Sequence, residues 1–247
     1  MNLLGKEMEC MKIYLISKKR MIVALLGIFF LGASILFFNP NNIRTVFYES
    51  EPTPIRMGNP NENKMAFTCN VDWGNEVIPD MLKIFEEKGV KITFFVTGRW
   101  AEKYPDLLKQ IYEKGHEIGN HAYSHKMHSQ ISENENYLEI KKTEDVILRV
   151  LGIKPIYFAP PSGDYNLSTL KVAESLGYKT ILWSIDTIDW REDSTSAVII
   201  QRVMKKPHKG AILLMHPKPA TVRALPHLID KIQEEGIQIG TVSDLIK

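Results

Sequence analysis

Short apolar runs alternate with amphipathic stretches along most of this chain, from residue 65 to residue 240. The apolar runs, which predict buried strands, are residues 65–69, 92–96, 116–120, 156–159, 180–184, 211–215 and 237–240. The stretches with helical periodicity are residues 77–88, 105–114, 133–151, 167–176, 195–205 and 223–235, most of them followed by a glycine. Strands that alternate with helices favour a parallel α/β sheet covered on both faces. The short connections predict a small (β/α)7 barrel, and the pattern alone leaves a flat doubly wound sheet open.

The composition indicates one folded domain with an accessory segment. The chain has 247 residues, of which 44% are hydrophobic and 24% are charged, which is sufficient for one sizeable core. The formal net charge of +2, without a long basic run in the folded part, argues against a nucleic-acid partner. We expect residues 64–247 to form the domain and residues 39–63, which are rich in Asn and Pro, to form a stalk or linker.

The accessory segment is an uncharged stretch of eighteen residues, 21–38, that directly follows three basic residues at 18–20. A stretch of this length can just cross a bilayer, and preceding basic residues favour a cytoplasmic N-terminus. A cleaved signal peptide is the alternative, although no small-x-small cleavage site follows Phe38. The sequence therefore predicts a cytoplasmic segment at 1–20, a transmembrane signal anchor at 21–38, and a single-pass cell-membrane protein whose C-terminal domain is extracytoplasmic.

Polar side chains follow five of the predicted strands. They include Asn70 and Asp72 after the first strand, His121 and His125 after the third, Ser162 after the fourth, Asp186 after the fifth and His216 after the sixth. Because the carboxyl ends of parallel strands meet at one rim of a barrel, we expect one site there. Two histidines four residues apart can face the same way, and with Asp72 they supply the donors of a hydrolytic metal site.

Four motifs, in this order, resemble those of the NodB-homology polysaccharide deacetylases, also called carbohydrate esterase family 4. They are His121-Ala122-Tyr123-Ser124-His125, Ala159-Pro160-Pro161-Ser162-Gly163, Asp186-Thr187-Ile188-Asp189-Trp190 and Leu214-Met215-His216. The resemblance covers residues 64–247 and is closest to the membrane-anchored, sporulation-type branch, whose first motif contains a Trp-Gly pair like Trp73-Gly74. It implies a distorted (β/α)7 barrel and metal-dependent removal of acetyl groups from N-acetylated sugars.

The resemblance also assigns roles to individual residues. Asp72, His121 and His125 would hold a divalent metal, Zn²⁺ in the first place, with Co²⁺ and Ni²⁺ also compatible with such ligands. His216 would be the general acid for the leaving amine, oriented by Asp186. Substrate binding would fall to Trp190, Pro160, Pro161, Ser162, Gly163 and Leu214. An extracytoplasmic domain makes N-acetylated cell-wall glycan of the peptidoglycan type the expected substrate, and the oligomeric state is not predicted.

The first motif departs from the family pattern Thr-Phe-Asp-Asp-Gly. The chain reads Thr68-Cys69-Asn70-Val71-Asp72-Trp73-Gly74, which places Asn70 at the position of the general base. An amide cannot accept a proton at neutral pH, so the expected base is missing. An alternative registration makes Asp72 the base and leaves the metal one ligand short. The second departure is Ala159, which stands where the family carries an Arg that pairs with the catalytic Asp.

Three functions are compatible with these departures. The first is a deacetylase that uses a different base, such as His216 or a metal-bound hydroxide. The second is a catalytically silent glycan-binding protein, and the third is a hydrolase of an easier bond such as an ester. We expect a hydrolase, because a pure binding protein has little need for an oriented acid. Arg99, after the second predicted strand, is expected to form a surface salt bridge, with contact to an anionic glycan as the alternative.

Overall fold

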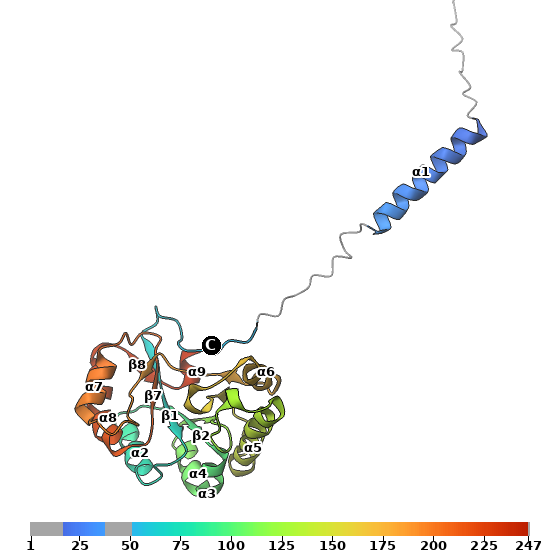
Figure 1. Ribbon diagram of the computed structural model, residues 1–247. Coiled ribbons are helices and arrows are strands. Elements are labelled where there is room, and N and C mark those ends of the chain that lie inside the picture. The colour runs from blue at the N-terminus through green and yellow to red at the C-terminus, as the bar shows by residue number, and fades with distance from the viewer. Residues whose placement is uncertain (1–16, 38–50, 247) are drawn as a thin grey trace, which may run out of the picture. The chain divides into compact units, whose positions relative to one another are not determined.

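The computed structural model describes residues 17–37 and 51–246, and of these residues 51–246 belong to one compact unit (Figure 1). Helix α1 (Lys18–Phe37) belongs to a separate unit. Over the described ranges, no helix combines the length and the apolar character that crossing a membrane requires. Most of the predicted cytoplasmic segment 1–20 and part of the predicted linker 39–63 lie outside the described residues.

The compact unit is built on a parallel sheet. Its eight strands are β1 (Lys64–Val71), β2 (Thr93–Val96), β3 (Glu117–Asn120), β4 (Tyr157–Phe158), β5 (Lys179–Thr180), β6 (Ile185–Asp186), β7 (Ile212–Met215) and β8 (Gln238–Gly240). The order is β5-β4-β3-β2-β1-β7-β6, with β8 also paired to β1, and all ladders are parallel. Among the described strands no ladder joins β5 to β6, so the sheet forms an incomplete barrel. The predicted parallel α/β barrel is confirmed at this level.

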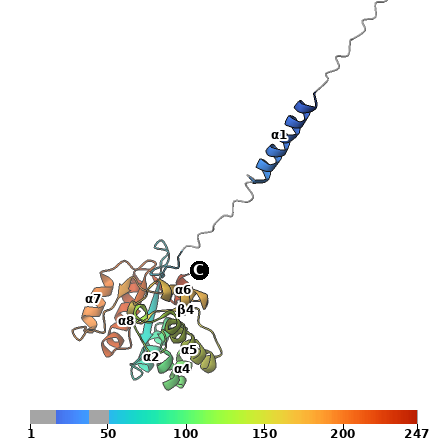
Figure 2. The same cartoon turned by 45° about the vertical axis from the view of Figure 1, so that its right-hand side comes forward.

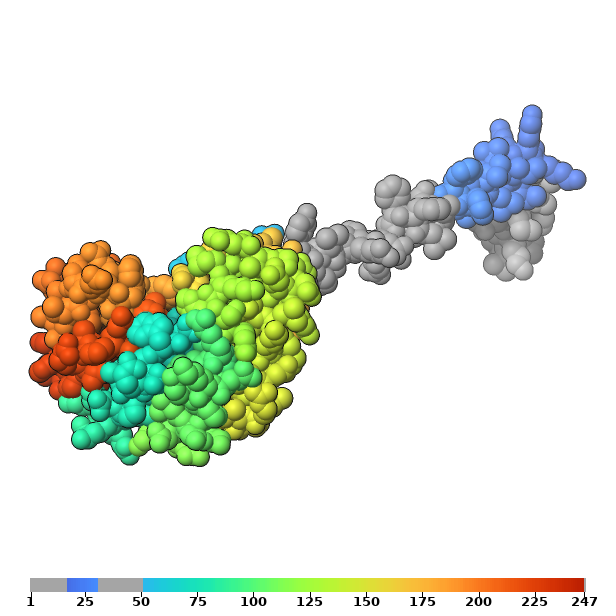
Figure 3. Space-filling model, turned by 60° about the horizontal axis from the view of Figure 1, so that its bottom comes forward, coloured from blue at the N-terminus to red at the C-terminus, as the bar shows by residue number. Residues whose placement is uncertain are grey.

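Helices surround the strands (Figures 1 and 2). They are α2 (Ile78–Glu87), α3 (Gly98–Lys103), α4 (Pro105–Glu113), α5 (Glu133–Leu151), α6 (Leu167–Ser175), α7 (Ser196–Met204), α8 (Pro219–Glu234) and α9 (Val242–Leu245). On the face shown in Figure 3, the α7–α8 region lies at one side and the α5–α6 region at the other, with α2 to α4 between them.

Local sequence signals account for the helix ends that the sequence predicted. Ser132 and Glu135 form a capping box at the start of α5, and Gly152 ends the helix in the left-handed conformation with φ of 72°. The predicted bounds of α5 are confirmed. The sequence missed the short helix α3, which Thr97 caps at its N-terminus, and α8 begins at Pro219 instead of residue 223.

The predicted strand at 180–184 is wrong. The structure replaces it with two short strands, β5 and β6, that pair with different neighbours at opposite ends of the sheet. One apolar run therefore crosses from one edge of the barrel to the other. A run of apolar residues indicates burial but does not show where backbone pairing breaks, which is why the sequence suggested a single strand.

Part of the predicted linker belongs to the folded unit. Ile55 forms a parallel bridge with Ile181, and its backbone N–H donates to the carbonyl oxygen of Thr180 at 2.8 Å. Two residues later, Met57 forms an antiparallel bridge with Ala211. Residues 55–57 thus pair with the residue after β5 and with the residue before β7, and the compact unit includes the chain from Glu51 onward.

His116 is a buried histidine at the end of the barrel opposite the polar strand ends. Its ring lies between those of Phe85 and Phe94, with centroid distances of 5.6 and 5.3 Å, and its Nδ1 accepts a hydrogen bond from the N–H of Ile92. Burial, followed by the charges of Lys91 and Lys114, lowers the pKa of His116 to about 4. The folded protein therefore keeps this ring neutral at pH values where the unfolded chain protonates it.

We expect His116 to make the fold acid-sensitive between pH 6.5 and pH 4. Its pKa is lower in the folded state, so the unfolded state binds more protons in this window and stability falls as the pH falls. The loss amounts to about 3 kcal/mol. His116→Asn retains an acceptor for Ile92 and should flatten the pH dependence of the free energy of unfolding, measured by urea titration. The exposed His227→Asn should leave the slope unchanged, and an equal slope in the His116 variant would contradict the assignment.

Candidate active site

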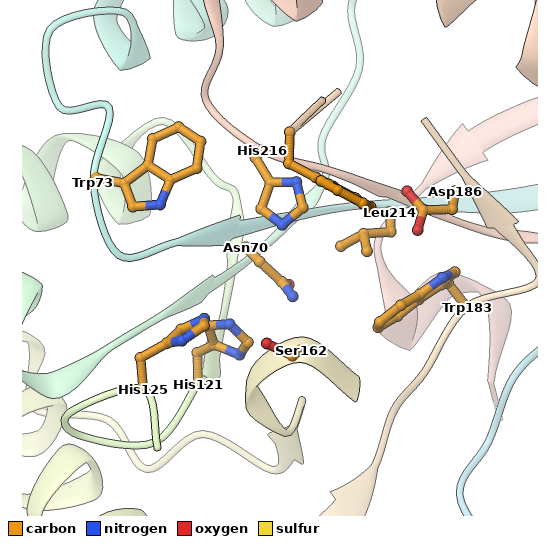
Figure 4. Close-up of a pocket in the computed structure, with 10 residues that line it drawn as sticks. Asn70, Trp73, His121, His125, Ser162, Trp183, Asp186, Leu214 and His216 are labelled. Atoms are coloured by element: carbon orange, nitrogen blue, oxygen red, sulfur yellow. The ribbon is translucent and has the colours of Figure 1, made fainter. Parts of the chain in front are cut away.

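The polar residues predicted from the strand ends meet at one rim of the sheet. In the parallel register, Asn70 of β1 pairs with Phe95 of β2, and Asp186 of β6 pairs with Leu214 of β7. The residues that follow β1, β3 and β7 therefore emerge at the same rim of the sheet, with β2 between β1 and β3. Figure 4 shows Asn70 pointing between His216 on one side and the two histidines of the third motif on the other.

These side chains surround a cavity of about 420 Å³, a volume typical of pockets for small ligands. Its lining residues are Asn70, Trp73, His121, His125, Ser162, Trp183, Asp186, Trp190, Leu214 and His216. Most of them were predicted from the sequence. Trp183 was not, because it belongs to the apolar run that the sequence suggested was a buried strand.

His216 is oriented by Asp189. The carboxylate of Asp189 accepts hydrogen bonds from Nδ1 and from the backbone N–H of His216, both at 2.7 Å, and from the Thr221 hydroxyl at 2.7 Å. Burial raises the pKa of Asp189, but these hydrogen bonds outweigh it and hold the pKa below its usual value. An ionised carboxylate on Nδ1 fixes the tautomer of the ring and leaves Nε2 available for proton transfer.

The prediction that Asp186 orients His216 is therefore wrong. The Asp186 carboxylate instead accepts a hydrogen bond from the N–H of Ile188 at 2.7 Å, in a tight turn that puts Ile188 in the left-handed region with φ of 51°. This conformation is strained for a β-branched residue and is held by hydrogen bonds to the Ile188 carbonyl oxygen from Ser194 and Arg202. The turn directs Asp189 towards His216, while Asp186 lines the cavity with its pKa raised by burial.

His121 and His125 lie together on the opposite wall of the cavity. Their ring centroids are 5.2 Å apart, and Nδ1 of His121 donates to the carbonyl oxygen of Ala159 at 2.6 Å, which leaves its Nε2 lone pair free. Burial, followed by the nearby charge of His125, lowers the pKa of His121 to about 3, so the ring is neutral at physiological pH. Burial also lowers the pKa of His125. Both rings are in the state that binds a metal.

Asp72, the third predicted metal ligand, is held by Arg99. Arg99 Nε donates to Oδ1 of Asp72 at 2.6 Å, Nη2 donates to Oδ2, and the Thr97 hydroxyl donates to Oδ1 at 2.8 Å. Burial raises the pKa of Asp72, but Arg99 and Thr97 together lower it below its usual value. The expected salt bridge of Arg99 is thus present, and its partner is the predicted metal ligand.

The donors as arranged do not fit a divalent metal. Within residues 17–37 and 51–246, no group of three or more His, Cys, Asp or Glu side chains is placed to hold an ion. Two neutral imidazoles are in place, but both carboxylate oxygens of Asp72 already accept from a cation. Asn70, which lines the same cavity as the two histidines, offers an amide and not a further carboxylate.

Asn70 is buried and its amide faces the cavity (Figure 4). Its side-chain oxygen has no hydrogen-bond partner among the described residues, which is costly for a buried polar atom and typical of a site that awaits a ligand. An amide can donate to or accept from a bound sugar, but it cannot act as a base. Ala159 is also buried, and its contribution to the site is the backbone carbonyl that orients His121.

Aromatic side chains form the walls of the cavity. The Trp73 ring stacks on His216 with a centroid distance of 5.9 Å and an angle of 16° between the ring planes. Lys218 Nζ lies 4.6 Å from the centroid of the Trp73 ring. Trp190 is 57% exposed, so a large apolar surface is available to a ligand at the mouth of the cavity.

The predicted substrate-binding loop, Pro160 to Gly163, contributes mainly through Ser162. Ser162 adopts φ of 56° and lines the cavity together with Leu214. Pro160, Pro161 and Gly163 do not line it. Gly163 is required for two reasons. A Cβ atom there would lie 2.7 Å from the Trp183 ring, and the residue has φ of 65°, in the left-handed region that favours glycine.

Comparison with known proteins agrees with this geometry. The sequence profile of the polysaccharide deacetylase family matches residues 57–181. The chain is 40% identical to the uncharacterized protein YlxY of Bacillus subtilis, over 79% of this chain and 61% of that relative. It is 32% identical to a peptidoglycan-N-acetylglucosamine deacetylase of Bacillus cereus, over 76% of this chain and 70% of the relative.

Solved structures include a relative that is described as a pseudoenzyme. The structure of BA3943, described as a CE4 family pseudoenzyme from Bacillus anthracis, has a TM-score of 0.77 and 39% identity, over 79% of this chain and 69% of that one. A mutant of BA3943 described as having restored enzymatic activity is equally similar, with a TM-score of 0.77. On the evidence of fold, motifs and identity, this chain belongs to the polysaccharide deacetylase family, whose enzymes hydrolyse carbon–nitrogen bonds of N-acetylated sugars.

Proposed function

We propose that this protein acts on N-acetylated cell-wall glycan of the peptidoglycan type, as a deacetylase whose hydrolytic step is slow. The observation that carries the proposal is the cavity in which His216, oriented by Asp189, faces the neutral pair His121 and His125. An oriented imidazole next to a sugar-sized cavity is machinery for proton transfer, which a simple binding surface does not need.

The cavity suits an N-acetylated sugar. Trp190 offers a largely exposed ring for contact with a pyranose, and the Asn70 and Ser162 side chains supply polar atoms for an acetamide or hydroxyl group. Relatives carry names that specify peptidoglycan N-acetylglucosamine as substrate. The same class of glycan is the natural first test for this chain.

The slow step follows from the residues that are present. Asp189 holds a proton on Nδ1 of His216, so Nε2 can accept a proton from water and later donate it to the leaving amine. Asn70 cannot share this work, because its amide does not accept a proton at neutral pH. Loss of one general base typically costs about 10²- to 10⁴-fold in rate.

The membrane-anchored, sporulation-type assignment is part of the same proposal. It is supported by the uncharged stretch at 21–38 with basic residues before it, and by the extracytoplasmic location of cell-wall glycan. Labelling of full-length protein in intact cells with a membrane-impermeant reagent should modify lysines of residues 51–247. Protection of these lysines until the cells are broken would contradict it.

Acetate release and binding, measured on the same glycan, test the main proposal. Full-length protein would be mixed with N-acetylated peptidoglycan fragments, with added Zn²⁺, Co²⁺ or Ni²⁺ and with an EDTA control. We expect fragments to bind, and acetate release to be slower by about 10²- to 10⁴-fold than in a relative that has an Asp at the base position. His216→Ala should abolish the release, and Trp190→Ala should weaken binding about fivefold through loss of ring contact. Absence of both binding and release would contradict the proposal.

A glycan-binding protein without catalysis is the second candidate. The pairing of Asp72 with Arg99 favours it, because this pair removes a carboxylate from the predicted metal ligands. Binding of the fragments that depends on Trp190, together with no acetate release under any metal condition, would identify this second function.

A further inference from the structure

The carboxylate of Asp72 accepts hydrogen bonds from Arg99 and Thr97. Both of its oxygens accept from the guanidinium group, and Oδ1 also accepts from the Thr97 hydroxyl. The Asp72 side chain is only 11% exposed, whereas that of Arg99 is 50% exposed. Hydrogen bonds from a fork-shaped guanidinium to a carboxylate are among the strong ones in proteins, and limited exposure of the carboxylate reduces their screening by solvent.

The backbone places Arg99 beside the metal-ligand loop. Arg99 follows Gly98 in α3, and their backbone N–H groups donate to the carbonyl oxygens of Tyr123 and Ala122, at 3.2 and 2.9 Å respectively. These acceptors lie between His121 and His125. Gly98 permits this close approach, because a Cβ atom there would lie 2.4 Å from the Tyr123 ring. The guanidinium group is thus positioned by the same loop that carries the two histidines.

We propose that Arg99 is an internal cation that competes with a divalent metal for Asp72 and so sets the metal affinity of the Asp72, His121 and His125 group. An ion can gain the Asp72 carboxylate only when the guanidinium releases it. The displaced Arg99 would then remain as a positive charge next to a divalent cation, which further disfavours binding. The inference rests on the contacts of Asp72 and does not depend on the proposed activity on glycan.

Direct measurement of metal affinity tests this inference. Zn²⁺ affinity of the full-length protein would be measured by competition with a chromophoric chelator, and Co²⁺ affinity by visible absorption. We expect Arg99→Gln to bind both ions about 10- to 100-fold more tightly than the unaltered protein, because the charged hydrogen bonds to Asp72 no longer have to be broken. Arg99→Lys keeps the positive charge but loses the fork-shaped pair of donors, so its metal affinity should lie between those of the unaltered protein and Arg99→Gln.

Matched variants distinguish this competition from a general effect of charge. Arg149→Gln removes an exposed Arg that pairs with Glu102 and not with Asp72, and should leave the affinity unchanged. Adding Asp72→Asn to Arg99→Gln should remove the gain. Equal affinities of the unaltered protein and Arg99→Gln, or a gain that survives Asp72→Asn, would overturn the inference. Thermal unfolding of each variant, performed without metal, verifies that the half-exposed position 99 tolerates Gln.

Discussion

Asn70→Asp should raise the rate of acetate release from N-acetylated peptidoglycan fragments by about 10²- to 10⁴-fold, the usual contribution of a general base. Asp has nearly the same shape as Asn, and the side chain of residue 70 already points into the cavity (Figure 4). The Asn70 oxygen is buried without a partner among the described residues, so the replacement breaks no hydrogen bond to that atom. The carboxylate adds the proton acceptor that the site lacks.

The effect should require the carboxylate and not merely the loss of the amide. Asn70→Ala opens space without adding a base and should leave the rate at or below its original value. Release would be followed in the presence of Zn²⁺, both in the unaltered background and in Arg99→Gln. If Asn70→Asp fails to accelerate release in both backgrounds, the missing base is not what limits hydrolysis.

The second large effect is expected at Asp189. In the Asn70→Asp background, Asp189→Asn should lower the rate of acetate release by about 10²- to 10⁴-fold. Both carboxylate oxygens of Asp189 accept from His216, one from Nδ1 and one from the backbone N–H. An amide has only one acceptor oxygen, so one of these donors would face an NH₂ group. The simplest relief is a change of tautomer, which moves the ring proton to Nε2 and removes the acceptor from the cavity.

Comparison with Asp186→Asn makes this prediction specific. Asp186 lines the cavity but accepts a hydrogen bond from Ile188 and not from His216. The fold-loss in rate caused by Asp186→Asn should therefore be at least about ten times smaller than the fold-loss caused by Asp189→Asn. A larger loss in Asp186→Asn would return the orienting role to Asp186.

The sequence determined the general arrangement of the domain and the rim of the sheet at which its polar residues meet. Strand β1 is buried along nearly its whole length, as its apolar run predicts, and the capping residues of α5 define both of its ends. In a parallel sheet all carboxyl ends lie at one rim, so polar residues after β1, β3 and β7 had to meet. This is why the sequence alone places Asn70, His121, His125 and His216 at one rim.

Short-range geometry within that rim was decided only by the tertiary structure. Asp186 and Asp189 are three residues apart in one motif, and the left-handed conformation of Ile188 selects which of them reaches His216. Sequence spacing does not specify such a turn, because the hydrogen bonds that stabilise the strained conformation of Ile188 come from Ser194 and Arg202, further along the chain.

The same reason applies to contacts between segments that are distant in the sequence. Arg99 meets Asp72 because α3 is hydrogen-bonded to the loop that follows β3, and Ile55 enters the sheet because β5 and β6 leave an open edge. Periodicity in a sequence reports which residues are buried and in which kind of element. It does not report which charged side chains become neighbours, since that depends on how the elements pack. The sequence thus determined the fold class and the types of side chain in the site, and the packing of the elements decided which hydrogen-bond partner each of these side chains has.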